Sequence, residues 1–187
     1  IKDIEYANKL GFEIKLLAVS ERSYIDSKDS LSLNIWVAPS LIPKSHPLAM
    51  VDGVNNAILI EASPLGKIML YGPGAGSGPT AASVVSDILN LKASLAKKIS
   101  SNDPLLSFNF WRDCHIIDFN QISKKNYLRI ICLDTPGVIG KIGDIFGKND
   151  VSIESIVQLD ASENKAEIVV ITHEVSNGKF ENSKEEI

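Results

Sequence analysis

The sequence predicts an α+β fold in two parts, and three observations support this. Segments that alternate apolar and polar residues recur between residues 12 and 71 and predict half-buried strands. A glycine-rich loop at 72–78 follows the last of these strands and precedes a long stretch with helical periodicity. From residue 126 onward, the pattern predicts a strand, a helix and two further strands.

The first part opens with a short helix and continues in strands. Asp3 is a suitable N-cap for a helix over 3–10, and Gly11 stands where a helix commonly ends. A strand over 12–19 places its apolar side chains on one face: Phe12, Ile14, Leu16 and Ala18. Residues 21–30 are polar and predict a loop, and Trp36 on the next strand is expected in the core. Further strands are expected at 31–37, 56–62 and 67–71.

The glycine-rich loop has two interpretations. Glycine lets a backbone approach a ligand closely, and the free N–H groups of a helix start favour an anion, so the loop could hold a phosphate-bearing cofactor. Residues 76–81 fit the loose G-x-G-x-x-A form of a dinucleotide-binding fingerprint. However, that motif requires a parallel strand after the helix and an acidic residue at the end of this strand. Neither follows the helix here, which runs to about Lys98. A tight connection without a ligand is the alternative.

The second part contains one candidate binding loop. After a strand over 127–133, the turn Asp134-Thr135-Pro136-Gly137 leads into a helix with Val138, Ile139 and Ile142 on its inner face. The free N–H groups at this helix start could bind a small carboxylate, or the loop could be a plain turn. Strands at 151–159 and 166–172 follow, and Ser176–Ile187 could begin a second helix.

The composition excludes several classes of function. Hydrophobic residues make up 44% of the 187 residues, so a core can form. The net charge is −4 and the lysines are scattered, so no basic surface is available for nucleic acid. No apolar run approaches the ~20 residues that cross a bilayer, and no signal peptide is present. We therefore expect a cytoplasmic protein that binds neither membranes nor nucleic acid.

The remaining candidate residues do not assemble into a metal or nucleophile site. His46, His115 and His173 are far apart and lack metal-ligand spacing, so no metal is expected. Cys114 and Cys132 are too few for a disulfide framework and are interpreted as reduced thiols. His46 lies in a loop, and its favoured role is a structural hydrogen bond.

The motifs of both parts resemble known families. Four ordered segments of the first part are similar to homoserine dehydrogenase: 10–18, 39–49, 51–57 and 71–81. Residues 126–187 resemble an ACT domain through Asp134 to Gly140, Val151 to Ile156 and Gln158. The resemblance covers nearly the whole chain and places the C-terminal part of a catalytic domain at 1–98, a linker at 99–125 and an ACT domain at 126–187.

The homoserine dehydrogenase resemblance implies NAD(P)-dependent interconversion of L-aspartate 4-semialdehyde and L-homoserine, in threonine and methionine biosynthesis. By motif position, Gly76 is expected to contact NADP or NAD, with Gly74 and Ala75 beside it. The family's catalytic lysine and aspartate and its nucleotide fingerprint have no match here, so no catalytic residue is assigned. The determinant of NAD or NADP preference belongs to the same missing part. The chain begins with Ile1 rather than Met, which is typical of a fragment.

The ACT resemblance implies an amino-acid effector, with threonine as the family's usual candidate. Its expected contacts are Gly137, Val138, Ile139, Ser152 and Ile153. The βαββαβ pattern of this fold is incomplete here: a ferredoxin-like βαββ unit is expected, with its last strand missing. The family also implies a homo-oligomer. The alternative functions are a stand-alone amino-acid-binding or dimerisation module without catalysis, and another ACT-bearing enzyme such as aspartokinase.

Overall fold

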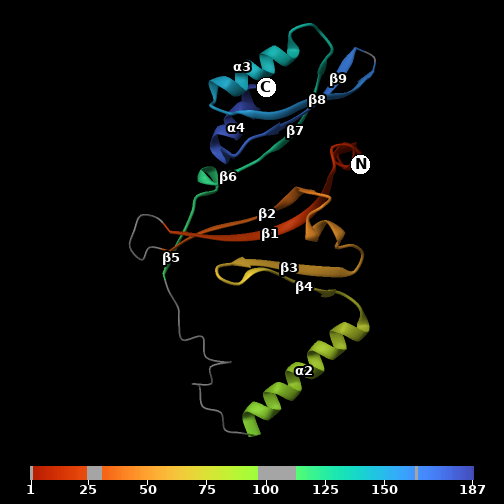
Figure 1. Ribbon diagram of the computed structural model, residues 1–187, viewed down its shortest axis with the longest axis vertical. Coiled ribbons are helices and arrows are strands. Elements are labelled where there is room, and N and C mark those ends of the chain that lie inside the picture. The colour runs from red at the N-terminus through yellow and green to blue at the C-terminus, as the bar shows by residue number, and fades with distance from the viewer. Residues whose placement is uncertain (1, 25–30, 97–112, 163) are drawn as a thin grey trace. The chain divides into compact units, whose positions relative to one another are not determined.

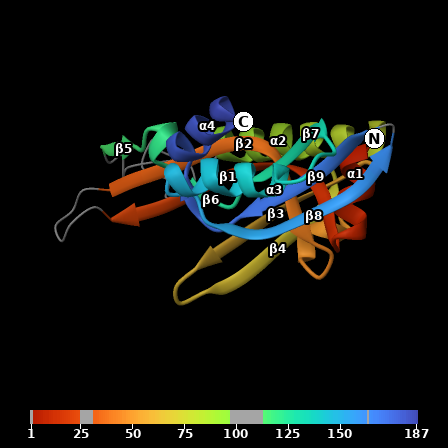
Figure 2. The same cartoon turned by 90° about the horizontal axis from the view of Figure 1, so that it is seen from above.

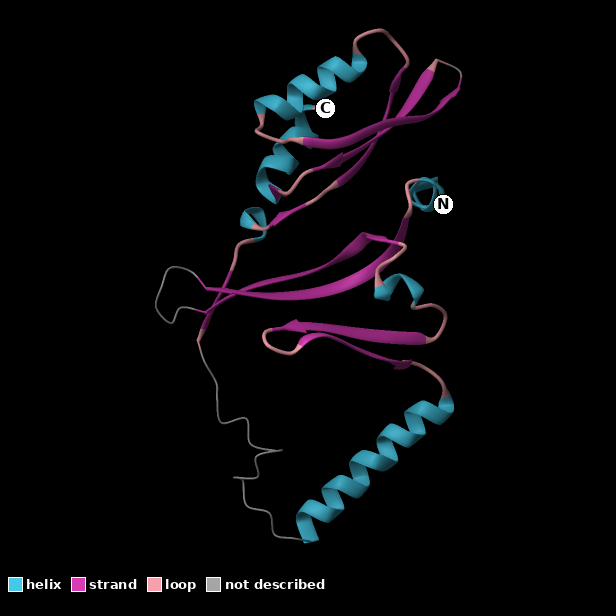
Figure 3. Ribbon diagram, viewed as in Figure 1, coloured by secondary structure: helices cyan, strands magenta, loops and turns pink. Residues whose placement is uncertain are grey.

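The computed structural model describes residues 2–24, 31–96, 113–162 and 164–187 (Figures 1 and 3). The chain divides into two compact units, one of residues 1–41 and 114–187 and the other of residues 42–113. The described residues form four α-helices and several small sheets, so the predicted α+β class is confirmed.

The first unit begins with helix α1 (Lys2–Lys9) and strand β1 (Phe12–Tyr24). Gly11 between them has a φ of 84°, the left-handed conformation that favours glycine after a helix. The helix starts one residue earlier than predicted, so Asp3 lies in its first turn and is not the N-cap; its carboxylate instead accepts a hydrogen bond from Arg129. β1 joins a sheet of order β1-β2-β5 with β2 (Leu31–Pro43) and β5 (Cys114–Ile116).

Three expectations about this first sheet were wrong: the end of β1, its buried face and the burial of Trp36. β1 extends five residues beyond the predicted 12–19, and on its predicted inner face Leu16 is 72% exposed, whereas Leu17 and Val19 on the other face are half-buried. Trp36 is half-buried rather than in the core, and the Lys124 Nζ lies 5.3 Å from the centroid of its ring. Alternation identified the strand but could not decide which face the rest of the unit would cover.

The C-terminal sheet of the first unit has the order β7-β9-β8, and both pairings are antiparallel. Two helices, α3 and α4, pack on one face of it, and Figure 2 shows α3 over the strands. Their contact forms the main core, in which Phe146 and Val170 are fully buried. The elements are β7 (Tyr127–Leu133), α3 (Val138–Lys148), β8 (Ile153–Ser162), β9 (Lys165–Thr172) and α4 (Asn177–Glu186).

This sheet agrees with the predicted βαββ unit, and the second helix foreseen at 176–187 is present. In the described residues, β7 pairs with β9 on one side and with no strand on the other. Two short elements, η2 (Phe119–Gln121) and β6 (Ser123–Lys124), lie between the preceding sheet and β7. β6 pairs antiparallel with β10 (Val175–Ser176), which lies between β9 and α4.

The second unit is a hairpin followed by a long helix. β3 (Asn55–Ala62) and β4 (Gly66–Pro73) pair antiparallel over their whole length, after the short helix η1 (Pro47–Met50). The periodicity predicted helix α2 (Ser77–Ala96), which begins within the glycine-rich segment 72–78 and leaves only 74–76 as the loop after β4. None of its side chains is buried, although it carries large apolar residues: Val84, Val85, Ile88, Leu89, Leu91 and Leu95.

Candidate functional site

The first candidate site is the loop between β4 and α2 in the second unit. Gly74, Ala75 and Gly76, the residues predicted to contact a cofactor, are consecutive and exposed immediately before the first residue of α2. The Gly76 carbonyl accepts a hydrogen bond from the Thr80 N–H at 3.1 Å and so closes the first helical turn. The N–H groups of Ser77 and Gly78 form no backbone hydrogen bond within the described residues, so both are free to bind an anion.

The glycines of this loop are required for different reasons. Gly76 has a φ of 124°, a conformation that side chains rarely adopt. At Gly74, a Cβ atom would lie 1.8 Å from the Asn56 Nδ2, so the amide side chain of β3 fills the space that any other residue would need. A Cβ at Gly78 would meet nothing within 4 Å, which leaves the start of α2 open to an approaching group.

The second candidate site is a pocket of about 480 Å³ at the N-terminus of α3. Three predicted effector residues line it: Gly137, Val138 and Ile139. The remaining lining residues come from the preceding turn, from α3 and from the inner face of the sheet: Asp134, Thr135, Pro136, Gly140, Gln158, Ala166 and Ile168. The pocket therefore joins polar groups at its rim to an apolar wall formed by β9.

The backbone at the start of α3 is arranged for an anionic group. Gly137 is the N-cap with a φ of 91°, and no side chain caps the helix there. The Val138 N–H bonds to the Thr135 carbonyl at 3.3 Å, whereas the N–H groups of Ile139 and Gly140 form no backbone hydrogen bond within the described residues. A carboxylate at this end would satisfy these donors and interact favourably with the positive end of the helix dipole.

Two polar side chains of the pocket complement this anion site. Asp134 supplies a carboxylate and Gln158 an amide, and neither forms a side-chain hydrogen bond or ion pair in the described part of the chain. Together with the α3 N-terminus, they could bind the ammonium and carboxylate groups of one amino acid. Sequence reasoning noted Gln158 only as part of a motif and did not assign Asp134, Ala166 or Ile168 to the site.

Ser152 and Ile153, the other two predicted effector residues, lie outside this pocket. Ile153 pairs with Thr172 at the start of β8, and the Ser152 carbonyl accepts a hydrogen bond from the His173 N–H at 2.9 Å. The pocket lies at the N-terminus of α3, near the start of β9, whereas β8 begins shortly after the end of α3. The 11 residues of α3 separate the two ends by roughly 16 Å. The structure therefore does not bring these two residues together with Gly137–Ile139.

His46 has a structural role in the second unit. The His46 Nδ1 accepts a hydrogen bond from the Leu48 N–H at 3.3 Å and caps η1, the structural role that was favoured for it. Within the described ranges, no group of three His, Cys, Asp or Glu side chains is placed to hold a metal ion. None of the helices found there is long and apolar enough to cross a membrane.

Comparison with known proteins gives a family match for each part of the chain. The family model of homoserine dehydrogenase matches residues 1–89, and that of the ACT domain matches residues 126–187. A homoserine dehydrogenase from Synechocystis sp. is 44% identical over 99% of this chain, and one from Bacillus subtilis is 33% identical over 96%. The chain spans only 43% and 40% of the length of these two relatives.

Solved structures agree with these matches. The crystal structure of a homoserine dehydrogenase from Thiobacillus denitrificans superposes on 100% of this chain with a TM-score of 0.83 and 30% identity, and the chain covers 41% of it. The Staphylococcus aureus homoserine dehydrogenase at pH 7.5 superposes with a TM-score of 0.56 at 26% identity, again over 41% of that chain. The ordered matches, first to the dehydrogenase and then to the ACT domain, show that the chain belongs to the homoserine dehydrogenase family.

Proposed function

We propose that this chain is part of an NAD(P)-dependent homoserine dehydrogenase that interconverts L-aspartate 4-semialdehyde and L-homoserine in threonine and methionine biosynthesis. The observation that carries the proposal is the order of the two family matches along one chain, with 44% identity to a homoserine dehydrogenase over 99% of its length. The proposed boundaries are a catalytic part at 1–98, a linker at 99–125 and an ACT domain at 126–187.

The β4–α2 loop is the proposed contact with the cofactor. Its exposed glycines, its free N–H groups and the open space at Gly78 suit a close approach of the cofactor to the backbone. Gly76, Ala75 and Gly74 are the proposed contacts, in that order of importance. The bound nicotinamide would supply hydride transfer, and this loop would position the cofactor.

The activity is tested by homoserine-dependent reduction of NADP and NAD with the full-length protein. The expected result is turnover that requires L-homoserine and one of the two cofactors. The 187-residue chain alone is expected to be inactive, because it contains no match to the family's catalytic lysine, aspartate and nucleotide fingerprint. Turnover by this chain above the blank would contradict that expectation, and no turnover by the folded full-length protein would contradict the proposed activity.

The pocket beside α3 is the proposed effector site, and L-threonine is the proposed effector. The free N–H groups of Ile139 and Gly140 would bind the carboxylate, and the Asp134 carboxylate would bind the ammonium group. Titration calorimetry of the full-length protein with threonine, isoleucine and methionine tests this assignment. Binding that is weakened at least tenfold by Asp134→Asn supports it, and the absence of heat from all three amino acids contradicts it. The contribution of Ser152 and Ile153 stays a prediction.

A cytoplasmic homo-oligomer is the proposed state of the protein. Its support is the large apolar surface that the second unit exposes on its hairpin and on α2, because such patches mark sites where another protein surface binds, here a second copy or a further part of the full-length protein. The exposed apolar residues of the hairpin include Ile58, Ile60, Ile68 and Leu70. Light scattering of the full-length protein measures the mass, and a monomer at high concentration would contradict the proposal.

A further inference from the structure

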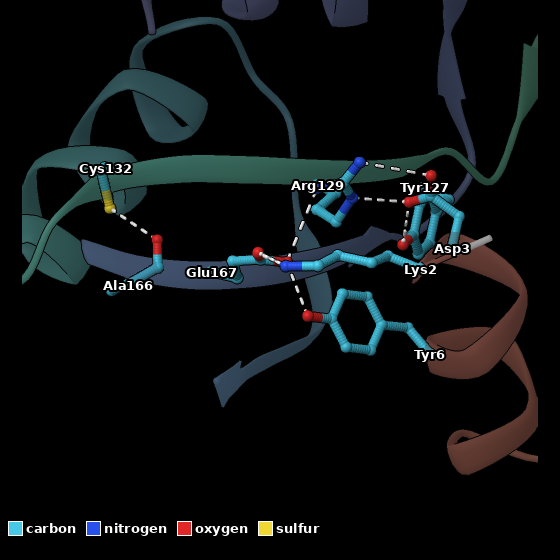
Figure 4. A network of polar contacts seen from close by, with 8 residues as sticks. All are labelled: Lys2, Asp3, Tyr6, Tyr127, Arg129, Cys132, Ala166 and Glu167. Atoms are coloured by element: carbon cyan, nitrogen blue, oxygen red, sulfur yellow. Dashed lines mark hydrogen bonds and ion pairs between the residues drawn. The ribbon is translucent and has the colours of Figure 1, made fainter. Parts of the chain in front are cut away.

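Helix α1 contacts the ACT sheet on the face opposite α3 and α4. A cluster of polar residues, here named the α1 cluster, forms this contact (Figure 4). Its members are Lys2, Asp3 and Tyr6 of α1, Tyr127 and Arg129 of β7, and Glu167 of β9. The cluster thus joins residues up to 165 positions apart in the sequence, from the part matched by homoserine dehydrogenase to the part matched by the ACT domain.

Glu167 is the centre of this cluster. The Tyr6 hydroxyl donates to the Glu167 Oε2 at 2.6 Å, the Lys2 ammonium donates to its other oxygen, and Arg129 Nη1 lies 3.6 Å from the Oε2. Only 12% of the Glu167 side chain is exposed, and Tyr6 is 1% exposed, so the Tyr6 contact is shielded from water, whereas 58% of the Lys2 side chain is exposed. Lys2, followed by the hydrogen bond from Tyr6, lowers the pKa of the Glu167 carboxyl.

Asp3 and Arg129 form the second half of the cluster. Arg129 Nε donates to Asp3 Oδ1 at 2.7 Å and Nη2 donates to Oδ2 at 3.4 Å, which is a two-pronged guanidinium–carboxylate contact. The Tyr127 hydroxyl donates to the same carboxylate at 2.9 Å. The hydrogen bond from Arg129 is the main cause of a lowered pKa at Asp3. This pair has a defined geometry, so a shift of β7 or β9 relative to α1 would weaken it.

The effector pocket lies on the other face of the same strand. Side chains alternate along a strand, and Ala166 and Ile168 face the pocket and the core, so Glu167 between them faces α1. Successive residues of a strand are only about 3.3 Å apart. A ligand that displaces Ala166 or Ile168 therefore moves the backbone that carries Glu167. Val169, which shares the face of Glu167, is also buried, so this side of β9 is covered.

Helix α1 belongs to the proposed catalytic part and leads directly into its first strand. Its end is fixed by hydrogen bonds from the Leu10 N–H to the Tyr6 and Ala7 carbonyls, at 3.0 and 3.1 Å, and Gly11 leads at once into β1. Resting on the proposed binding of an amino acid in the pocket, we propose that the α1 cluster is the contact through which pocket occupancy reaches the catalytic part. Occupancy moves β9, β9 moves Glu167, and Glu167 repositions α1 and the start of β1.

The proposal is tested in the full-length enzyme with Tyr6→Phe and Glu167→Gln. Tyr6→Phe removes a single hydroxyl and keeps the buried ring, and Glu167→Gln removes the charge and keeps the size. L-threonine is the probe, its binding is measured by calorimetry, and activity is measured without and with saturating threonine. Lys179→Ala is the matched control, because it breaks an ion pair with Asp150 in the same domain but outside the α1 cluster.

The expected result separates the binding of threonine from its effect on activity. Both variants keep most of their activity without threonine and bind threonine within about tenfold of the wild type, because coupling between two sites is reciprocal and its loss changes affinity by no more than the coupling factor. The change in activity that saturating threonine causes is at least fivefold smaller in both variants than in the wild type and is unaltered in Lys179→Ala. Retained threonine binding also shows that the ACT sheet of each variant is folded.

Three outcomes would overturn the proposal. The first is a response to threonine in both variants equal to that of the wild type, and the second is threonine binding to the wild type without any change in activity. Either outcome removes the α1 cluster from the regulatory path and leaves the amino-acid site intact. No threonine binding to the wild type removes the proposed effector, and the coupling that rests on it falls too. The calorimetric measurement on the wild type distinguishes this last outcome from the first two.

Discussion

Replacing Gly137 with alanine tests whether the start of α3 is held in its unusual backbone conformation. Gly137 has a φ of 91° and a ψ of −4°, and a Cβ placed there would meet nothing within 4 Å. The substitution therefore causes no clash with neighbouring groups, and its whole cost comes from the left-handed backbone. That cost is roughly 1–2 kcal/mol for a residue with a side chain.

Gly143→Ala is the matched control, and its expected effect has the opposite sign. Gly143 lies within α3, where a Cβ would also meet nothing within 4 Å. Alanine in a helix interior is more stable than glycine by about 0.5–1 kcal/mol. The two variants add the same methyl group six residues apart, so the difference between them isolates the backbone conformation at Gly137.

Native-state hydrogen exchange at the amides of α3 and β9 measures the effect, because it reports the opening of this domain in the intact protein. Gly137→Ala should lower protection about 5- to 30-fold, which corresponds to 1–2 kcal/mol. Gly143→Ala should raise protection about two- to fivefold, which corresponds to 0.5–1 kcal/mol. Equal protection in the two variants would refute the reasoning, because it would mean that the conformation of Gly137 carries no strain for a side chain.

Two further predictions concern the cofactor loop and the α1 cluster. Gly74→Ala should raise the KM for NADP about tenfold, on the order of 1.4 kcal/mol, because its Cβ would displace either the Asn56 side chain or the loop that is the proposed cofactor contact; an unchanged KM would contradict this. The lowered carboxyl pKa values of Glu167 and Asp3 mean that their contacts stabilise the fold above pH about 4 and are lost as the pH falls through the lowered values. The Tm of Glu167→Gln should therefore lie below that of the wild type at pH 7, and the gap should narrow below pH about 4; a constant gap would contradict this.

Local patterns predicted most elements of the fold because their causes are local. The first strand of the ACT sheet was predicted within its observed bounds, 127–133, because an apolar run ends at the turn residues Asp134 to Gly137. The extension of β1 to Tyr24 was missed, since the polar residues from Glu21 onward resemble a loop when neighbouring strands are ignored. A polar strand segment is stabilised by its partner, as in the hydrogen bond from the Asn34 side chain to Glu21 at 3.0 Å.

The candidate sites were predicted where they depend on one segment. Gly137 was identified from its place before a helix start and Gly76 from its motif position in the family resemblance, and both have positive φ values. The apolar wall of the pocket could not be identified in this way. Ala166 lies opposite Cys132 in the strand register, and that pairing depends on how β7 and β9 align rather than on any nearby residue.

A stronger signal was present in β9 itself. Residues 166–171 read Ala-Glu-Ile-Val-Val-Ile, so apolar side chains lie on both faces of the strand, and such a run predicts cover on both faces, whereas α3 and α4 cover only one. Glu167 lies within this apolar run, and a buried carboxylate requires cationic or hydroxyl donors close by. The sequence thus implies an additional covering element that carries such donors, and α1 supplies Lys2 and Tyr6. The sequence cannot identify that element, because the contact joins residues 165 positions apart and no local pattern reports it.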